Sequence, residues 1–360
     1  MSKKIKTFIV IGGTGGHVFP GCNLADHLSK SNYTIKLITD KRGLTYLDKY
    51  KHFDISILPS SPLIKGNILY QLISLALISY SVLISLIFLI FNRPNVIFGM
   101  GGYASFPICI AASILKIKFI IYENNLIIGK ANKHLLPFSY KILVSCKELE
   151  GIPKKYNYKI LEIGNIINKA IINFTKNNLA MEDISKICIL VLGGSQAAKV
   201  FAEKLPNIFK NCFDQGIPLK IYQHCLPNQN EDIKSFYEKT NIDYEIFNFS
   251  YNLVDYFSKI NLAITRSGSS ILAELTNANV PFIAVPLPSS ADNHQFKNAN
   301  YYKKRNFAFL IEEKDLSNKL FNLIKKIHND KSALNKILHC QRQFSDKNVY
   351  NNIDLLLRDL

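Results

Sequence analysis

One histidine in the chain directly follows a run of glycines, a combination that can hold an anion beside a base. Residues 12–17 read GGTGGH and come straight after the apolar stretch 7–11, which is typical of a buried strand. Glycines at the end of a strand let a ligand approach the main chain, and the free N–H groups of a following helix attract an anion. Histidine is the usual general base near neutral pH. We therefore predict a catalytic base at His17 beside an anion site, against the alternative of a tight turn with a surface histidine.

A second glycine-rich stretch, GMGGYASFP at 99–107, follows another predicted strand at 96–98. Ligands of open α/β sheets bind at the carboxyl edge of the strands, so we expect this stretch at the same edge of the same sheet as the first one. Gly101, Gly102 and Tyr103 are its candidate binding residues.

Three stretches in the second half of the chain bring polar groups to the ends of predicted strands. LGGSQAAK (192–199) offers Ser195 to a phosphate, although serine is also a common helix cap. RSGSSILAE (266–274) places hydroxyl groups and amides before a helix that carries Glu274. This glutamate can accept hydrogen bonds from ribose hydroxyl groups, or it can be a solvated helix residue. Gln295 follows the next strand, where the hydroxyl groups of a sugar can be bound.

One pattern occurs twice, about half a chain apart. TFIVIGGT (7–14) and CILVLGGS (188–195) each read as the strand and glycine turn that open a nucleotide-binding βα unit. We predict two Rossmann-like domains, 1–164 and 165–339, with an amphipathic helix from about 340 to 360 that packs back on the first. The boundary is set near Gly164, where LEIGN (161–165) ends a strand. Further strands are predicted, alternating with helical patterns as in parallel sheets, at 35–39, 96–98, 119–122, 142–144, 262–265 and 281–285.

The composition limits the partners that the chain can have. Its seven cysteines include no CxxC pair, which indicates reduced cytosolic thiols and neither disulfides nor a zinc site. The apolar run at 7–11 is too short for a secretory signal. No DxD triplet occurs, so we predict neither a metal nor a cofactor. The net charge of +17 indicates an anionic partner. Evenly spread lysines are typical of a solvated surface, and we do not predict nucleic acid as a partner.

Residues 68–91 contain no charged side chain and are long enough to cross a membrane. They lie inside a βα series, however, so a membrane span would separate strands of one sheet. Ser74, Ser81 and Ser85 fall on one helical stripe. Nearby basic residues outnumber the acidic ones, since between 60 and 140 the only acid is Glu123. We predict a helix in the interface of an anionic membrane, assisted by Lys65, Arg93, Lys116, Lys118, Lys130 and Lys133.

A nicotinamide-dependent oxidoreductase is a second hypothesis for the first domain. Asp40 stands at the end of the second predicted strand, where a ribose-binding acid of a dinucleotide domain belongs. The GxGxxG fingerprint fails, however, because Val18 occupies its third glycine position.

The motifs GGTGGHVFPG, GMGGYAS, ENN, GGSQAA, RSGSSILAE and DNHQ follow in this order over nearly the whole chain. The set resembles the MurG family, the bacterial undecaprenyldiphospho-muramoylpentapeptide β-N-acetylglucosaminyltransferases. The resemblance implies a GT-B fold, with two Rossmann-like domains whose parallel sheets face each other across a cleft. It implies inverting transfer of GlcNAc from UDP-GlcNAc to the C4 hydroxyl of a lipid-linked muramoyl pentapeptide in peptidoglycan synthesis. It also implies a peripheral protein at the cytoplasmic face of the bacterial inner membrane.

The same resemblance implies roles for individual residues. Thr14, Gly15 and Gly16 match donor-contacting positions, Asn125 a sugar contact, Ser195 a phosphate contact and Ser250 a backbone contact to uracil. The diphosphate and ribose element of the donor matches Ser269, Ser270, Ile271, Leu272, Ala273 and Glu274, and Gln295 matches a glutamine that contacts GlcNAc hydroxyl groups. The acceptor diphosphate is expected at Gly12, Gly13, Gly101, Gly102 and Tyr103.

The chain departs from the family pattern at several positions. The family's GNPVR is GNIIN here, so Asn168 replaces a donor-contacting arginine, and GGSQGAR has become GGSQAAK. The family's HEQN is YENN, and its QQ pair is His294-Gln295. The replacement at Asn168 keeps a third hypothesis open, a non-catalytic membrane scaffold that binds the sugar nucleotide without turnover.

Overall fold

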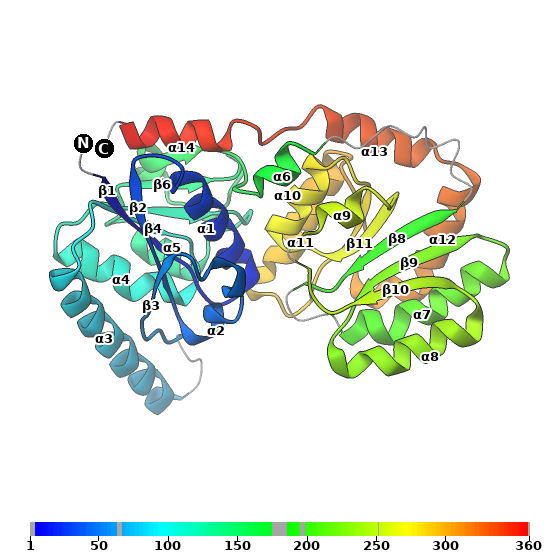
Figure 1. Ribbon diagram of the computed structural model, residues 1–360, viewed down its shortest axis with the longest axis horizontal. Helices are drawn as coiled ribbons and strands as arrows, with labels where there is room; N and C mark the ends of the chain where they lie inside the picture. Colours follow the sequence, from blue (N-terminus) through cyan, green and yellow to red (C-terminus); the bar gives the residue numbers. More distant parts are fainter. Residues whose placement is uncertain (1–3, 63–66, 175–185, 195–198, 251, 359–360) are drawn as a thin grey trace. The chain divides into compact units, whose positions relative to one another are not determined.

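The computed structural model describes residues 4–62, 67–174, 186–194, 199–250 and 252–358, and it divides into two compact units (Figure 1). Unit 1 comprises Met1–Ile167 and Asp346–Leu360, and unit 2 comprises Asn168–Ser345. The chain thus passes between the units at 167/168 and at 345/346, a few residues beyond the positions 164 and 339 suggested by the sequence.

Unit 1 is built on a seven-stranded sheet in which all neighbouring strands are parallel. In spatial order its strands are β3 (Asp54–Ile57), β2 (Tyr33–Thr39), β1 (Ile5–Val10), β4 (Val96–Gly99), β5 (Phe119–Glu123), β6 (Lys141–Val144) and β7 (Ile160–Glu162). Its helices are α1 (Gly15–Leu28), α2 (Lys41–Leu44), α3 (Ile68–Phe91), α4 (Gly102–Ile114), α5 (Lys130–Leu135) and α14 (Val349–Arg358).

Unit 2 repeats this plan with a six-stranded parallel sheet. In spatial order its strands are β10 (Asp243–Phe247), β9 (Leu219–His224), β8 (Ile187–Leu192), β11 (Leu262–Arg266), β12 (Phe282–Val285) and β13 (Phe309–Leu310). Its helices are α6 (Lys169–Ile172), α7 (Lys199–Asp214), α8 (Asn230–Thr240), α9 (Val254–Phe257), α10 (Ser269–Asn277), α11 (His294–Lys304), α12 (Leu316–Asn329) and α13 (Ser332–Arg342).

The central strands are buried on both faces, which explains their unbroken apolar sequences. Phe8, Ile9 and Val10 of β1 have no exposed surface, and neither have Ile189, Leu190 and Val191 of β8. β1 and β4 are neighbours in register, with Val10 opposite Gly99. The two glycine-rich stretches therefore leave the same edge of one sheet, as the sequence predicted.

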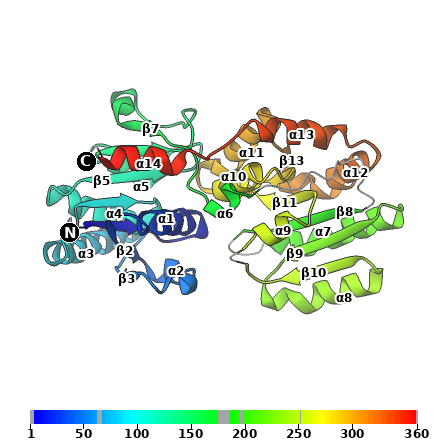
Figure 2. The same cartoon turned by 45° about the horizontal axis from the view of Figure 1, so that its top comes forward.

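Helix α3 has the reverse of the usual polarity of a surface helix. Its serine stripe faces the protein and packs toward α4, which lies beside it in both views (Figure 1 and Figure 2). Each serine hydroxyl donates to the carbonyl four residues earlier: Ser74 to Tyr70 (2.9 Å), Ser81 to Leu77 (2.8 Å) and Ser85 to Ser81 (2.8 Å). Each hydroxyl thus has an acceptor within α3, and the stripe offers a small contact surface while the long apolar side chains point away from it.

The C-terminal helix α14 belongs to unit 1. Its buried side chains are those of Val349, Tyr350, Ile353, Leu356 and Leu357. Tyr350 donates from its hydroxyl to the carbonyl of Ile167 (2.6 Å), and Asp354 contacts Nε2 of His27 on α1 (2.8 Å). Just before the helix, buried Asp346 accepts hydrogen bonds from the main chain and side chain of Asn165 (2.9 and 3.1 Å). The last segment is thus fastened to the segment that follows β7.

Candidate active site

The imidazole of His17 lies against the backbone of the second glycine stretch. A Cβ atom built on Gly101 would lie 2.9 Å from Nδ1 of His17, and one built on Gly102 would lie 3.2 Å from Cδ2. Both glycines have positive φ angles, 95° and 72°, which side chains disfavour. Glycine is therefore required at both positions by conformation and by space. His17 stands in the first turn of α1, so the ring joins the two stretches at the carboxyl edge of the sheet.

The ENN motif reaches the same edge from β5. Asn124 donates from Nδ2 to the carbonyl of Gly16 (3.2 Å). Buried Glu123 accepts hydrogen bonds from the main chain and side chain of Asn125 (3.1 and 3.0 Å), from the main chain of Gly129 (2.8 Å) and from Nδ2 of Asn132 (3.0 Å). Glu123 therefore fixes the side chain of Asn125 beside the glycine stretches. The sequence analysis did not assign this role; its only signal was a single acid in a long basic region.

A matching arrangement lies at the carboxyl edge of the sheet of unit 2. Oε1 of Gln295 accepts hydrogen bonds from the main chain of Ser267 (3.1 Å), after β11, and of Leu287 (3.0 Å), after β12. Asn298 donates from Nδ2 to the carbonyl of Ser267 (3.2 Å). The hydroxyl of Ser267 is fully buried and has no hydrogen-bond partner among the described residues. Gln295 thus joins two strand ends, in front of the first turn of α10.

The turn that leads to Gln295 has an unusual backbone. Asp292 and Asn293 both lie in the left-handed region, with φ angles of 50° and 56°. Aspartate and asparagine tolerate this conformation better than most residues. It starts α11 at His294, so that Gln295 stands in the first turn of that helix. The DNHQ motif therefore forms a turn that positions the side chain of Gln295.

Glu274 is half-buried in α10, and no described residue donates a hydrogen bond to its carboxylate. Burial raises its pKa from 4.5 to about 7. A carboxylate in this setting is ready to accept hydrogen bonds from a ligand. Leu272 and Ala273 on the same helix have no exposed surface, and the main-chain N–H of Leu272 donates to the carbonyl of Gly268 (3.2 Å), so neither residue presents a group to a ligand in this structure. Ser269 is also buried, and Ile271 is half-buried.

The pH dependence of the free energy of unfolding should report the protonation state of Glu274. Because its folded-state pKa is raised, its protonated form stabilises the fold below about pH 4.5, and this contribution is lost as the pH rises through 7. We expect Glu274→Gln to raise the free energy of unfolding at pH 8 by about 1–3 kcal/mol and to leave it unchanged at pH 4. Urea unfolding at both pH values measures this. Glu203→Gln, at an exposed glutamate of α7, is the control, and an equal effect of Glu274→Gln at both pH values would contradict the assignment.

The other residues predicted to bind the donor or acceptor lie in different parts of the two units. Asn168 caps α6, since its Oδ1 accepts from the main chain of Ala170 (2.8 Å). Ser250 accepts from the main chain of Asn252 (3.1 Å) in the loop after β10. Tyr103, in the first turn of α4, is 39% exposed. Ser195 lies outside the described residues. Within the described part of the chain, no group of three or more His, Cys, Asp or Glu side chains could hold a metal ion.

Arg266, which the sequence analysis left without a role, is a structural residue. Its guanidinium pairs with Glu313 and donates to the carbonyls of Val285 and Pro286 (3.4 Å each). It also lies over the ring of Phe201, 4.8 Å from the ring centroid. This buried cation holds the ends of β11 and β12 together, so it supports the loop that carries Ser267.

Models of two protein families match the two halves of the chain. The glycosyltransferase family 28 N-terminal domain matches residues 7–144, and the glycosyltransferase family 28 C-terminal domain matches residues 188–353. The chain belongs to glycosyltransferase family 28. Its fold is therefore GT-B, built from two parallel α/β units as predicted.

Two relatives of this chain have the same name. A protein of Pelagibacter ubique is 35% identical over 99% of this chain and 98% of its own length; a protein of Rickettsia felis is 33% identical over 89% and 91%. Both are named UDP-N-acetylglucosamine–N-acetylmuramyl-(pentapeptide) pyrophosphoryl-undecaprenol N-acetylglucosamine transferase. The crystal structure of Acinetobacter baumannii MurG superposes with a TM-score of 0.78 at 22% identity, covering 99% of both chains. The resemblance to the MurG family is confirmed.

Proposed function

We propose that the protein transfers GlcNAc from UDP-GlcNAc to the C4 hydroxyl of undecaprenyl-diphospho-MurNAc-pentapeptide, with inversion at the anomeric carbon, in peptidoglycan synthesis. The observation that carries this proposal is the 35% identity with the Pelagibacter ubique transferase over 99% of the chain. The convergence of His17, both glycine stretches and Asn124 at one sheet edge supports it, because these are the residues that an acceptor diphosphate and its hydroxyl group require.

In this proposal unit 1 binds the acceptor and contributes some contacts to the donor, and unit 2 supplies the main donor site. Unit 1 binds the acceptor, with its diphosphate at Gly12, Gly13, Gly101, Gly102 and Tyr103. Unit 2 binds UDP-GlcNAc: the first turn of α10 receives the donor diphosphate, Glu274 accepts from the ribose hydroxyl groups and Gln295 contacts the sugar. Donor contacts are also proposed for Thr14, Gly15, Gly16, Asn125, Ser195 and Ser250. The capping role of Asn168 leaves its side chain amide poorly suited to replace an arginine.

The reaction is a single displacement. His17 takes the proton from the C4 hydroxyl while that oxygen attacks the anomeric carbon and the bond from this carbon to UDP breaks. UDP leaves with both electrons of that bond. The positive end of α10 and its free N–H groups stabilise the diphosphate of UDP. This chemistry uses groups of the chain itself and explains why glycine loops and helix starts recur at each predicted contact.

The oxidoreductase hypothesis is disfavoured by the surroundings of Asp40. Its Oδ1 accepts from the main chain of Gly43 (2.8 Å) and Gly13 (3.2 Å), and its Oδ2 accepts from Arg42 and Ser60 (2.8 and 3.0 Å). A ribose-binding carboxylate needs its oxygens for the ligand. Here both oxygens are engaged within the protein.

Transfer of labelled GlcNAc from UDP-GlcNAc to a short-chain lipid-linked muramoyl pentapeptide tests the proposal. We expect a labelled disaccharide product with the wild-type protein. A protein that binds UDP-GlcNAc, seen as a raised melting temperature, but forms no product would support the scaffold hypothesis instead. A rise in melting temperature with NAD and none with UDP-GlcNAc would support the oxidoreductase.

We further propose that α3 holds the protein at the cytoplasmic face of the inner membrane. The helix is long and apolar enough to cross a membrane, but its serine stripe packs on the unit. Its outer face exposes large apolar side chains, among them Leu69 (60%), Leu75 (60%) and Phe91 (82%). The basic residues that follow α3 in the chain, up to residue 140, are all exposed, namely Arg93, Lys116, Lys118, Lys130 and Lys133; Lys65 lies outside the described residues. An apolar helix face in a basic region of the chain suits an anionic bilayer surface.

Substitutions on the outer face of α3 should release the protein from membranes. We expect the triple variant Leu69→Gln, Leu75→Gln and Leu83→Gln to lower the partition coefficient for vesicles with anionic lipid by about 10²-fold or more, because each leucine contributes about 1.5–3 kcal/mol when buried. Cosedimentation with the vesicles measures it. Leu355→Gln, at a leucine of α14 that is 57% exposed, is the control. Unchanged cosedimentation of the triple variant would contradict the proposal.

A further inference from the structure

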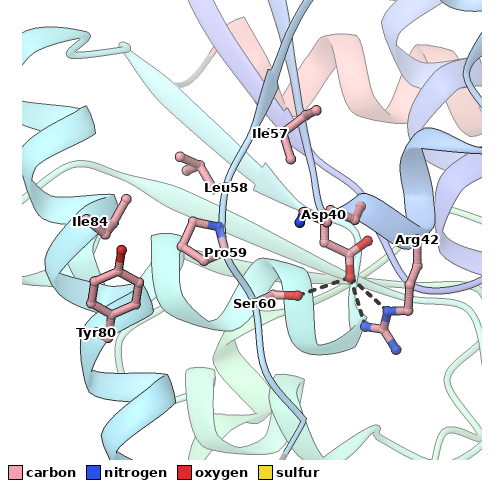
Figure 3. A pocket seen from close by; sticks show the side chains of 9 residues that line it. Asp40, Arg42, Ile57, Leu58, Pro59, Ser60, Tyr80 and Ile84 are labelled. Carbon is pink, nitrogen blue, oxygen red and sulfur yellow. Dashed lines mark hydrogen bonds and ion pairs between the residues drawn. The ribbon is translucent and has the colours of Figure 1, made fainter.

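A pocket of about 500 Å³ opens between α2, the segment after β3 and the middle of α3 (Figure 3). Its volume falls within the range of about 300–1,000 Å³ that is typical of ligand sites. We name it the α2–α3 pocket. It is lined by Asp40, Lys41, Arg42, Ile57, Leu58, Pro59, Ser60, Tyr80 and Ile84. The residue roles proposed above leave this pocket unused.

One end of the α2–α3 pocket is polar and adjoins the first glycine stretch. Arg42 donates from Nε and Nη2 to Oδ2 of Asp40 (3.1 and 2.8 Å), and Ser60 donates to the same oxygen (3.0 Å). Burial alone would raise the pKa of Asp40, but these bonds and those from Gly43 and Gly13 lower it below the usual range of an aspartate. Asp40 thus remains charged and orients the guanidinium of Arg42.

The guanidinium of Arg42 is close enough to the glycine stretch to share an anion with it. A Cβ built on Gly13 would lie 4.0 Å from Nη2 of Arg42. The side chain of Arg42 is 53% exposed, so its outer N–H groups can reach a ligand. Arginine binds phosphate oxygens with two parallel hydrogen bonds. The main-chain N–H of Gly13 itself donates to Asp40 (3.2 Å). A phosphate beside the glycine stretch can therefore be bound by the N–H groups of Arg42 that point away from Asp40.

The other end of the pocket is apolar and leads to the outer face of α3. Figure 3 shows Tyr80 and Ile84 of α3 across from Arg42, with Ile57, Leu58 and Pro59 between them. Tyr80 is 56% exposed and Ile57 is 50% exposed, so both offer apolar surface to a ligand. Polarity therefore changes along the pocket in one direction, from a cation beside the glycine stretch to the apolar surface of α3.

We propose that the α2–α3 pocket binds the phosphate–prenyl junction of a polyprenyl diphosphate, with Arg42 on the phosphate and the first isoprene units against Tyr80, Ile84 and Ile57. This assignment rests on the proposed function, because the ligand is the lipid end of the acceptor. It adds a requirement that a diphosphate site alone does not create: affinity for the acceptor depends on the first few isoprene units even where no membrane is present.

Acceptors with one, two, three and four isoprene units, assayed in detergent without lipid, test the proposal. For the wild type we expect the KM of the acceptor to fall by about tenfold or more from one to three units, because the added isoprene units bury apolar surface in the pocket. The double variant Ile57→Ser and Tyr80→Ser should abolish this dependence on chain length. Arg42→Gln should raise the KM of all acceptors by about tenfold, while the KM of UDP-GlcNAc stays the same.

Tyr158→Ser is the matched control, because Tyr158 is an exposed tyrosine of unit 1 (70%) outside the pocket. It should retain the wild-type dependence on chain length. A KM that is independent of chain length in the wild type, or a dependence that survives in the double variant, would overturn the proposal. Direct binding separates this failure from failure of the proposed function. Farnesyl diphosphate should bind the wild type and bind Arg42→Gln at least about tenfold more weakly, whether or not GlcNAc is transferred.

Discussion

Replacement of His17 by alanine should lower kcat for GlcNAc transfer by about 10²–10⁴-fold, the usual contribution of a general base. The ring lies on the backbone of Gly101 and Gly102, at the edge where the acceptor hydroxyl is proposed to bind. A base that takes a proton in the transition state affects kcat, whereas a residue that only binds the acceptor affects KM. Steady-state kinetics of transfer with both substrates varied distinguishes the two roles.

Two further variants make the test of His17 specific. His17→Gln keeps a hydrogen-bonding side chain but cannot take the proton, so it should be as inactive as His17→Ala. His134→Ala, at an exposed histidine of α5, should be as active as the wild type. Full activity of His17→Gln would assign the histidine a positioning role only.

The second large effect is expected at Gly101, which is proposed to bind the acceptor diphosphate and also lies against the ring of His17. Alanine there would place its Cβ 2.9 Å from Nδ1 of His17, on a backbone with a φ of 95°. We expect Gly101→Ala to displace the imidazole and to lower kcat/KM by about 10²-fold, because misplacement of a catalytic group by about 1 Å has this effect. The strained backbone should also lower the free energy of unfolding by about 1–3 kcal/mol. Transfer kinetics and urea unfolding measure both.

Gly216 separates displacement of the histidine from backbone strain. Its φ angle is 77°, but a Cβ there would meet no atom within 4 Å. Gly216→Ala should therefore destabilise the fold by about 1 kcal/mol and leave kcat/KM as in the wild type. An equal loss of activity in both variants would show that reduced stability, and not the position of His17, explains the result for Gly101→Ala.

The sequence predicts all inner strands of both sheets except β9, but only one of the four edge strands. β1, β2, β4, β5, β6, β8, β11 and β12 are expected, as is β7 at the strand that ends near Gly164; β3, β9, β10 and β13 are not. β3, β7, β10 and β13 are the edge strands of their sheets. An edge strand pairs on one side only and stays partly exposed, so its sequence does not need an unbroken apolar run. β10 reads DYEIF and β3 reads DISI, which carry charge at the positions where the inner strands are apolar.

The candidate site could be predicted only where one local pattern carried the signal. Glycines after a strand revealed the stretches at 12–17 and 99–103, and parallel pairing placed them together. The bonds of Glu123 with Gly129 and Asn132 could not be predicted, because they depend on the path of the connection from β5 to α5, which no local pattern specifies. The cap at Asn168 was equally hidden, since the sequence there was compared with a family arginine and not with a helix start.

The inward serine stripe of α3 affects the solubility of the protein before it binds a membrane. A surface helix normally becomes more soluble when its serines face outward, but in α3 the serines contribute nothing to solubility. Its exposed leucines and isoleucines form a surface that water disfavours. Burial of this surface is therefore favourable in a newly made molecule, and any apolar surface can bury it, including α3 of a second copy. Affinity for lipid and a tendency to aggregate are two outcomes of one sequence pattern, and only the concentration of each competing surface decides between them.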